Sequence, residues 1–224
     1  YNATIFAYGA TGSGKTFSMS GEQSKPGIVP RAIGKVFEKV QAMATKDSDT
    51  LFMVSMGFVE LYNNTFRDLL ADQDSKKSDY DSSTNNLLRD SRDFGNTRNS
   101  RDFDKDKKNK HGPRIELHES PTGGVHLTGS KTLRMPVRSA QQAMLLVAAG
   151  NKARATAATN LNEHSSRSHS ILTIHVESQR KICLSDNHQQ EEEEAARSST
   201  PRIVCLGKMH LVDLAGSERL GMSG

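Results

Sequence analysis

Residues 9–16, with the sequence Gly-Ala-Thr-Gly-Ser-Gly-Lys-Thr, constrain the fold more than any other segment, because they match the pattern G-x-x-x-x-G-K-[ST]. The apolar run Thr4–Tyr8 before them predicts a short buried strand, and Gly14–Met19 predicts the start of a helix. In that context the glycines let backbone N–H groups surround an anion, Lys15 neutralises the β- and γ-phosphates, and Thr16 supplies a Mg²⁺ ligand. A glycine-rich turn with an incidental lysine is the alternative. The strand and helix around the motif favour nucleotide binding.

Two polar tracts account for the low apolar content of 34% and the mean hydropathy of −0.62. Ala71–Gly112 consists mainly of Asp, Ser, Asn, Lys and Arg, and it repeats Ser-Arg-Asp-Phe at 91–94 and 100–103. Ser178–Arg202 contains four consecutive Glu residues at 191–194. Neither tract has enough apolar surface to offset the entropy lost on ordering. Residues 71–112 and 178–202 are therefore predicted to be disordered insertions, and a docking site for a partner is the alternative for the first.

Strand and helix patterns alternate along the rest of the chain. Pro30–Ala44 has apolar residues at helical spacing, and Ser139–Gly150 is predicted as a helix with Ser139 as N-cap and Gly150 as its stop. The predicted strands are Leu51–Tyr62, Ile115–Glu119, Val125–Met135, His169–Glu177 and Ile203–Asp213. Leu51–Tyr62 is expected to be a central strand, and the two strands after it a hairpin. This order predicts an α/β domain with a mixed sheet.

Two further segments carry chemistry suited to a phosphate. Asp213-Leu-Ala-Gly216 follows an apolar strand, where the carboxylate can hold Mg²⁺ and the glycine N–H can approach a phosphate closely. Residues 162–169, Asn-Glu-His-Ser-Ser-Arg-Ser-His, are rich in hydroxyl groups. His164 and His169 lack the companion ligands of a zinc site, and the chain has no G-x-S-x-G sequence of a serine hydrolase.

Four segments in this order resemble the kinesin motor domain: IFAYGATGSGKTFSM, GFVELYNNTFRDLL, TNLNEHSSRSHSILTI and LVDLAGSER. They are similar to that family's phosphate loop, central strand, first switch and second switch. The resemblance implies a phosphate-loop NTPase fold with a central mixed sheet flanked by helices. It implies that residues 1–224 are a partial motor domain, truncated at both ends, with residues 71–112 and 178–202 as insertions.

The resemblance also implies roles for individual residues. The phosphate-binding loop would comprise Gly9, Ala10, Thr11, Gly12, Ser13, Gly14, Lys15 and Thr16, with Phe17 against the adenine. The implied metal ligands are Thr16, Ser166 and, through water, Asp213. The implied catalytic residues are Ser165 and Ser166, which would close over the γ-phosphate with the help of Asn162, Gly216, which would sense it, and Arg167 and Glu218, whose ion pair would position the attacking water.

The sequence departs from the family pattern in several places. Ala10 stands where Gln is common, Phe17 where His is common, and Asn64 where an acidic residue is usual. The segment with the adenine-contacting Arg-x-Arg-Pro is absent, and so are the helices after the second switch, which form most of the family's microtubule-binding face. The 224 residues alone are therefore expected to be inactive.

The function implied for the parent protein is an ATP-dependent microtubule motor. Its cofactors would be ATP and Mg²⁺, its partner microtubules, and its location the cytoplasm and the microtubule cytoskeleton. A dimer through a coiled coil outside these residues is also expected, and neither nucleic acid nor membrane insertion is. The formal net charge of +4 is compatible with an acidic partner surface but too small to argue for one, and two cysteines are too few for a disulfide framework.

Two other classes compete with the motor. A GTPase would need an Asn-Lys-x-Asp base reader, but Asn109-Lys110 is followed by His-Gly and Asn151-Lys152 by Ala-Arg. A kinesin relative that binds nucleotide without productive motor activity remains the main alternative. The intact residues of the phosphate loop and both switches weigh against it.

Overall fold

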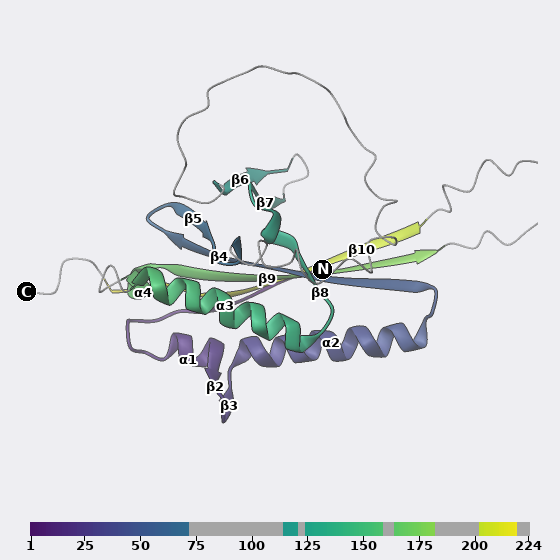
Figure 1. The fold of residues 1–224 in the computed structure, drawn as a ribbon, viewed down its shortest axis with the longest axis horizontal. Coiled ribbons are helices and arrows are strands. Elements are labelled where there is room, and N and C mark those ends of the chain that lie inside the picture. The colour runs from purple at the N-terminus through teal and green to yellow at the C-terminus, as the bar shows by residue number, and fades with distance from the viewer. Residues whose placement is uncertain (72–113, 121–123, 159–163, 182–201, 219–224) are drawn as a thin grey trace, which may run out of the picture.

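The computed structural model describes residues 1–71, 114–120, 124–158, 164–181 and 202–218 (Figure 1). Its centre is a six-stranded sheet. The strands in spatial order are β1 (Asn2–Ala7), β10 (Arg202–Asp213), β9 (His169–Lys181), β4 (Thr50–Tyr62) and β5 (Thr65–Asp68), and β8 (Met135–Val137) also pairs with β4. Strand β1 runs parallel to β10, and the other pairs are antiparallel. The predicted mixed sheet is confirmed.

The long helices lie on one face of this sheet (Figure 1). The helices are α1 (Lys15–Ser20), α2 (Ile28–Lys46), α3 (Ala140–Ala158) and the single turn α4 (His164–Arg167). The short hairpin of β2 (Gly21–Glu22) and β3 (Lys25–Pro26) joins α1 to α2. On the opposite face lies a second hairpin, β6 (Glu116–Glu119) with β7 (Val125–Thr128), followed by the 3-10 turn η4 (Lys131–Arg134).

The hydrophobic core lies between the sheet and α1–α3. Successive residues of a strand point to opposite faces, so Val54, Met56 and Phe58 of β4 share the helix side, and all three are buried. They belong to one cluster with Ile33 of α2 and Val147 of α3. This apolar layer fixes the helices against the strands that carry the polar site residues.

The helix predictions are confirmed at their N-terminal ends. Helix α2 begins at Ile28, which places Pro30 in the first turn, where a missing N–H costs nothing. Ser139 caps α3, because its Oγ accepts a hydrogen bond of 3.1 Å from the Gln142 N–H.

The prediction that Gly150 ends this helix is wrong. Helix α3 continues to Ala158, and Gly150 lies within it. A Cβ atom at Gly150 would lie 2.3 Å from Cδ1 of Phe58. The glycine therefore permits close contact between α3 and β4 and does not terminate the helix. The two added turns carry Arg154, which is central to the site described below.

Three strand predictions also need correction. Strand β1 is mostly exposed, and Phe6 keeps 62% of its surface accessible, because β1 pairs on one side only within the described part of the chain. The expected strand Val125–Met135 divides into β7, η4 and the start of β8, since Gly129 turns the chain with a φ of 99°. Residues 178–181 and 202, expected within an insertion, extend the paired strands β9 and β10. The remainder of both expected insertions, apart from Ala71, lies outside the described residues.

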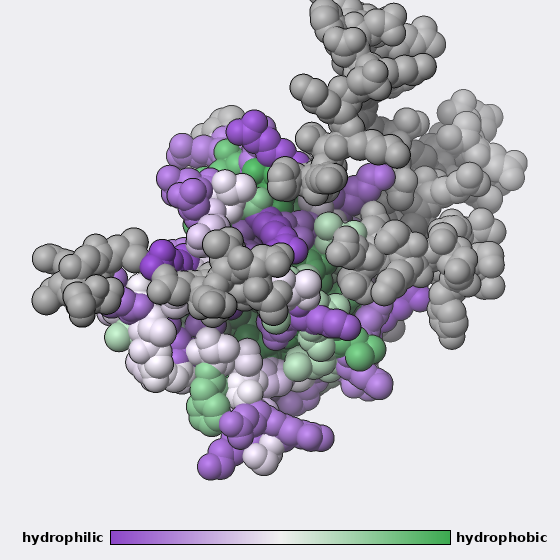
Figure 2. All heavy atoms as spheres, turned by 60° about the vertical axis from the view of Figure 1, so that its left-hand side comes forward, coloured by the Kyte–Doolittle hydropathy of each residue, from purple (hydrophilic) through white to green (hydrophobic). Residues whose placement is uncertain are grey.

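Hydrophilic side chains predominate on the face shown in Figure 2, and apolar side chains reach the surface in separate places. None of the helices in the described ranges has the length and apolar character needed to cross a membrane.

Candidate functional site

The phosphate loop folds around the ammonium group of its own lysine. Lys15 Nζ donates hydrogen bonds to the carbonyl oxygens of Gly9 at 2.9 Å and Ala10 at 2.7 Å. Gly12 and Gly14 have φ values of 81° and 89°, in the left-handed region that glycine adopts without strain. The strand–loop–helix order predicted for this motif is confirmed by β1 and α1. The lysine is thus held inside the loop, at the point where the motif places a phosphate.

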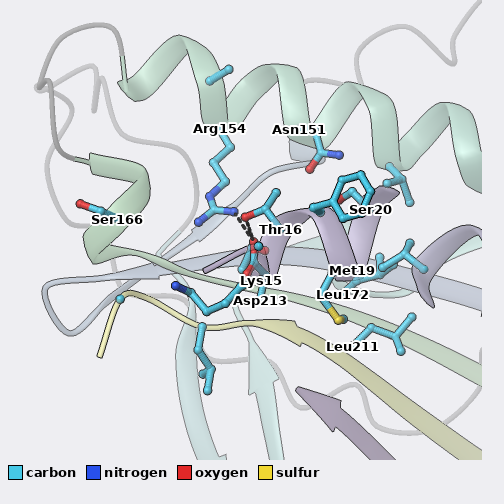
Figure 3. Close-up of a pocket in the computed structure, with 18 of the residues that line it drawn as sticks. Lys15, Thr16, Met19, Ser20, Asn151, Arg154, Ser166, Leu172, Leu211 and Asp213 are labelled. Atoms are coloured by element: carbon cyan, nitrogen blue, oxygen red, sulfur yellow. Dashed lines mark hydrogen bonds and ion pairs between the residues drawn. The ribbon is translucent and has the colours of Figure 1, made fainter. Parts of the chain in front are cut away.

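A cavity of about 620 Å³ opens beside this loop, between α1, α3 and the ends of β9 and β10. Its polar lining includes Lys15, Thr16, Asn151, Arg154, Ser166 and Asp213 (Figure 3). Apolar side chains of the core form the rest of the wall, and Phe17, half exposed, also lines the cavity. A cavity of this size with a few convergent polar groups is typical of a small-molecule site.

The two carboxylate oxygens of Asp213 have different surroundings. Oδ2 accepts a hydrogen bond of 2.6 Å from the Thr16 hydroxyl. Oδ1 is buried and has no hydrogen-bond partner among the described residues. Hydroxyl and carboxylate oxygens are the protein ligands that Mg²⁺ takes beside a phosphate. The Thr16–Asp213 pair therefore fits a divalent cation, and the unpartnered Oδ1 gives it a place to bind directly or through water.

Three buried polar residues form a row across the sheet beside this pair. In the strand register, Glu60 of β4 pairs with Ser170 of β9, and Ser170 pairs with Asp213 of β10. All three are buried, and Glu60 keeps only 1% of its surface accessible. Because they share a register position, their side chains project together toward the helices.

Arg154 of α3 links the two ends of this row. Its Nε lies 3.3 Å from Glu60 Oε1, and its Nη1 lies 3.6 Å from Asp213 Oδ2. Its Nη2 donates to the carbonyl oxygen and the hydroxyl of Ser168, at 3.0 and 3.1 Å. One guanidinium group is therefore shared between two buried carboxylates, in the fixed fork geometry that only arginine offers.

The two predicted switch segments meet each other and the phosphate loop through their backbones. The Gly216 N–H donates to the Ser166 carbonyl oxygen at 2.7 Å, and the Ser217 N–H donates to the Gly9 carbonyl oxygen at 3.1 Å. The Ala215 N–H donates to His169 Nδ1 at 3.0 Å, so the ring proton of a neutral His169 is on Nε2. His169 thus connects its own segment to the backbone of the second predicted switch.

Glu218 contacts the phosphate loop and not Arg167. Its Oε2 accepts a hydrogen bond of 2.9 Å from the Thr11 N–H, and its Oε1 accepts one from the Thr11 hydroxyl. These bonds lower the pKa of the Glu218 carboxyl to about 2. A Cβ atom at Gly216 would lie too close to both Glu218 carboxylate oxygens and to Thr11 Oγ1, so a side chain there would displace these contacts. The ion pair between Glu218 and Arg167 that the resemblance implies stays a prediction.

The other predicted residues are placed as follows. Ser166 lines the cavity, but its hydroxyl points away from Thr16 and Asp213 in Figure 3. Ser165 lies in α4, and its side chain is outside the described part of the chain, as is all of Asn162. The backbone N–H of Ser13 donates a hydrogen bond of 3.2 Å to the Ala10 carbonyl oxygen, which closes the turn of the loop.

Sequence reasoning missed the members of the buried row other than Asp213, together with Arg154. Glu60 did leave a signal, because it is the one charged residue in the apolar run Leu51–Tyr62. Arg154 left none, since it lies beyond the glycine at which the helix was expected to stop.

Comparison with known proteins gives one consistent result. The sequence model of the family described as the kinesin motor domain matches residues 1–224. The chain is 34% identical over 227 residues to the kinesin-like protein KIN-4A of Arabidopsis thaliana, covering all of this chain and 19% of that protein. It is 33% identical over 230 residues to the human kinesin-like protein KIF27, covering 100% of this chain and 13% of that one. The chain thus spans less than a fifth of the length of these relatives.

A solved structure agrees with the sequence matches. It is titled "Structure of a fast kinesin: Implications for ATPase mechanism and interactions with microtubules". The TM-score is 0.64 at 28% identity, and the match covers 100% of this chain and 47% of the solved one. The likeness therefore extends from the sequence to the arrangement of strands and helices.

Proposed function

The chain belongs to the kinesin motor domain family, and we propose that the protein containing it is a microtubule-stimulated ATPase whose hydrolysis cycle drives movement along microtubules. Membership of this family implies nucleotide binding. The observation that carries the proposal is the Thr16–Asp213 pair beside the Lys15 loop, with a buried carboxylate oxygen left for a cation.

The residues of the cavity suit Mg-ATP in the following way. Lys15 would exchange the carbonyl oxygens of Gly9 and Ala10 for the β- and γ-phosphates, and the loop N–H groups would surround them. Thr16 and Asp213 would hold Mg²⁺, and Ser166 would complete the shell once its hydroxyl turns inward. Bound there, Mg²⁺ would neutralise part of the negative charge of the phosphates. Phe17 would pack against the adenine ring.

The backbone contact between the switches suggests how the γ-phosphate would be sensed. The Gly216 N–H donates to Ser166 in this structure, and we propose that it donates to a γ-phosphate when ATP is bound. Glu218 would then leave Thr11 for Arg167, forming the ion pair that positions the attacking water. Ser165 and Ser166 would close over the phosphate in the same step. The exchange of partners would make the site respond to the difference between ATP and ADP.

The remaining proposals rest on the family. The proposed track is a microtubule, and the proposed location is the cytoplasmic microtubule cytoskeleton. A coiled coil outside these residues is proposed to join two chains. Each concerns the whole protein, of which this chain spans a part. They are tested together with the motor activity.

The experiment is ATP turnover by the full-length protein with and without microtubules. Saturable stimulation is expected for the unchanged protein. Arg167→Ala and Glu218→Ala are each expected to slow turnover more than they weaken ATP binding, and the double variant little further, because a charge-assisted pair needs both partners. Arg180→Ala, an exposed arginine at the far end of β9, is the matched control and should leave turnover unchanged.

Two results would contradict the proposal in different ways. Tight Mg-ATP binding without any turnover would favour the alternative, a kinesin relative without productive motor activity. Additive losses in the double variant would show that Arg167 and Glu218 do not act as a pair, while leaving the ATPase assignment in place.

A further inference from the structure

Thr11 of the phosphate loop binds an anion that belongs to the chain itself. Its N–H group lies in the strand-to-helix turn of the motif, among the backbone donors that such a loop presents to phosphate oxygens. That N–H donates a hydrogen bond of 2.9 Å to Glu218 Oε2, and the Thr11 hydroxyl donates to Glu218 Oε1. Both carboxylate oxygens of Glu218 are thus bound at a loop whose motif is suited to phosphate.

The Glu218 side chain is held in its ionised form. The two hydrogen bonds from Thr11 are the main cause that lowers its pKa from 4.5 to about 2, and the positive charge of Lys15 lowers it further. A carboxyl group with this pKa stays ionised at every pH near neutrality. Protonation therefore does not release Glu218 from Thr11, and only another anion can compete for the same donors.

The two residues before Glu218 bring its carboxylate to this place. The Ser217 N–H donates a hydrogen bond of 3.1 Å to the Gly9 carbonyl oxygen, which ties the segment to the first residue of the loop. Gly216 has no side chain, and a Cβ atom there would lie too close to Glu218 Oε1 and to Thr11 Oγ1. The contact between Thr11 and Glu218 thus depends on a glycine at position 216.

The same glycine relates Thr11 to the last phosphate of a nucleoside triphosphate. The Gly216 N–H is the group proposed above to bind the γ-phosphate, and the space where a Cβ of Gly216 would lie adjoins Thr11 Oγ1. A γ-phosphate bound by Gly216 would therefore lie beside the Thr11 donors and the Glu218 carboxylate. Two anions so close repel each other. A nucleoside diphosphate has no group at this position, so it meets no such repulsion.

We propose that Glu218 competes with the γ-phosphate of ATP for the two donor groups of Thr11. A triphosphate has to displace the carboxylate before its last phosphate binds, whereas a diphosphate leaves the contact between Thr11 and Glu218 in place. The contact therefore lowers the affinity for ATP relative to ADP. It also closes the γ-phosphate position against free phosphate once the carboxylate has returned. This inference rests on the proposed nucleotide site and adds an internal inhibitor to it.

The test is equilibrium binding of two nucleotides to the full-length protein: ADP and adenylyl imidodiphosphate, an ATP analogue that resists hydrolysis. Thr11→Val removes one of the two donors to Glu218 and leaves the carboxylate in place. It should tighten binding of the analogue by about 3- to 10-fold, the range of one exposed hydrogen bond to a charge, and leave the affinity for ADP unchanged. Thr11→Ser keeps the hydroxyl and should bind both nucleotides like the wild type. Thr45→Val, which removes an exposed threonine hydroxyl on α2, is the matched control.

A double-variant cycle separates competition from a general loosening of the loop. Glu218→Ala removes the carboxylate and should also raise the preference for the analogue over ADP. Adding Thr11→Val to it should change little, because the Thr11 donors then have no competitor to lose. A loosened loop predicts weaker binding of both nucleotides instead. Binding is the readout because Glu218→Ala is also expected to slow turnover, and thermal unfolding of each variant shows whether it is folded.

The outcomes distinguish this inference from the proposed function. If the wild-type protein binds neither nucleotide, both are overturned. If the wild type binds both nucleotides and Thr11→Val leaves its preference unchanged or shifts it toward ADP, the inference alone is overturned. Additive effects in the double variant also overturn the inference alone. A preference for the analogue that Thr11→Val raises, that Thr11→Ser leaves as in the wild type and that the double variant does not raise further supports both.

Discussion

The two faces of the central sheet treat charge and apolar surface in opposite ways. On the face covered by α1–α3, buried charges alternate in sign along Glu60, Arg154 and Asp213, and the apolar side chains are packed. On the opposite face, β6–β7 and η4 border a cavity of about 490 Å³ whose lining includes Lys208, His175 and His210. On the first face, buried groups of opposite charge neutralise one another. On the second face, several apolar side chains stay exposed.

This difference indicates which face of the sheet contributes most to the free energy of unfolding. On the face away from the helices, Phe6, Val204 and Leu206 keep 62%, 50% and 60% of their surface accessible. Side chains with that exposure contribute little to folding in the described chain. The helix-covered face therefore holds both the core and the chemistry.

The largest expected effect compares a phenylalanine from each face. Phe58→Ala should lower the free energy of unfolding by about 3–5 kcal/mol, because it leaves a cavity beneath α3. Phe6→Ala should cost no more than about 0.5 kcal/mol, as is usual for an exposed residue. Denaturant titration of both variants measures the contrast. If Phe6→Ala lowered the free energy of unfolding as much as Phe58→Ala, the contrast between the faces would be wrong. Another part of the protein would then have to cover the face that carries Phe6.

The next effect compares a lysine from each face, with nucleotide affinity as the readout. Lys15→Ala removes the cation at the centre of the phosphate loop and should cost about 3 kcal/mol of binding, or about 100-fold in affinity. Lys131→Ala, on η4, changes the net charge equally and should leave affinity unchanged. Equilibrium titration with ATP measures the affinity of both variants. Undiminished binding by the Lys15 variant would rule out this loop as the phosphate site.

A smaller effect sharpens the comparison within the covered face. Gly150→Ala should destabilise by about 1–3 kcal/mol, because its Cβ meets the Phe58 ring and α3 must shift. Gly34→Ala in α2 should stabilise by about 0.5–1 kcal/mol, since no atom lies within 4 Å of its Cβ and alanine favours the helix. The same substitution thus has opposite signs on the two helices, and thermal unfolding of both variants reports it. Stabilisation by both would mean that α3 does not press on β4.

The smallest effect concerns acid sensitivity of the exposed face. Burial, with Arg134, Lys208 and His210 nearby, lowers the pKa of His175 from 6.5 to about 4. Between these values the unfolded chain binds a proton that the folded chain does not, so stability falls as the pH drops from 6.5 toward 4. His175→Gln should remove part of this fall. Unfolding free energies at both ends of the window measure it, and identical slopes for the two proteins would contradict the prediction.

What the sequence could predict depended on whether a feature is local. The strand–loop–helix order around Gly9–Thr16, the cap at Ser139 and the strand Leu51–Tyr62 follow from neighbouring residues, and all three are confirmed. The role of Gly150 depends on Phe58, which is distant in sequence, so the local pattern predicts a helix end where the structure has a close contact between α3 and β4.

The missed part of the site has the same cause. Glu60, Ser170 and Asp213 become neighbours only through the registers of β4 with β9 and of β9 with β10. No spacing in the sequence encodes those registers. The residues predicted by motif are therefore those that contact one another through the loop and switch backbones, whereas Glu60, Ser170 and Arg154 join the site only through the fold.

The β9–β10 ladder has a practical consequence for labelling the molecule. Ser170 and Asp213 pair at one end of it and Lys181 and Arg202 at the other, with twelve register pairs in all. At about 3.4 Å per residue the two ends lie about 37 Å apart. A dye attached at the end of the ladder where Lys181 pairs with Arg202 would therefore lie far from Asp213 and the cavity beside it. That end of the ladder therefore offers a labelling point remote from the residues that line the cavity.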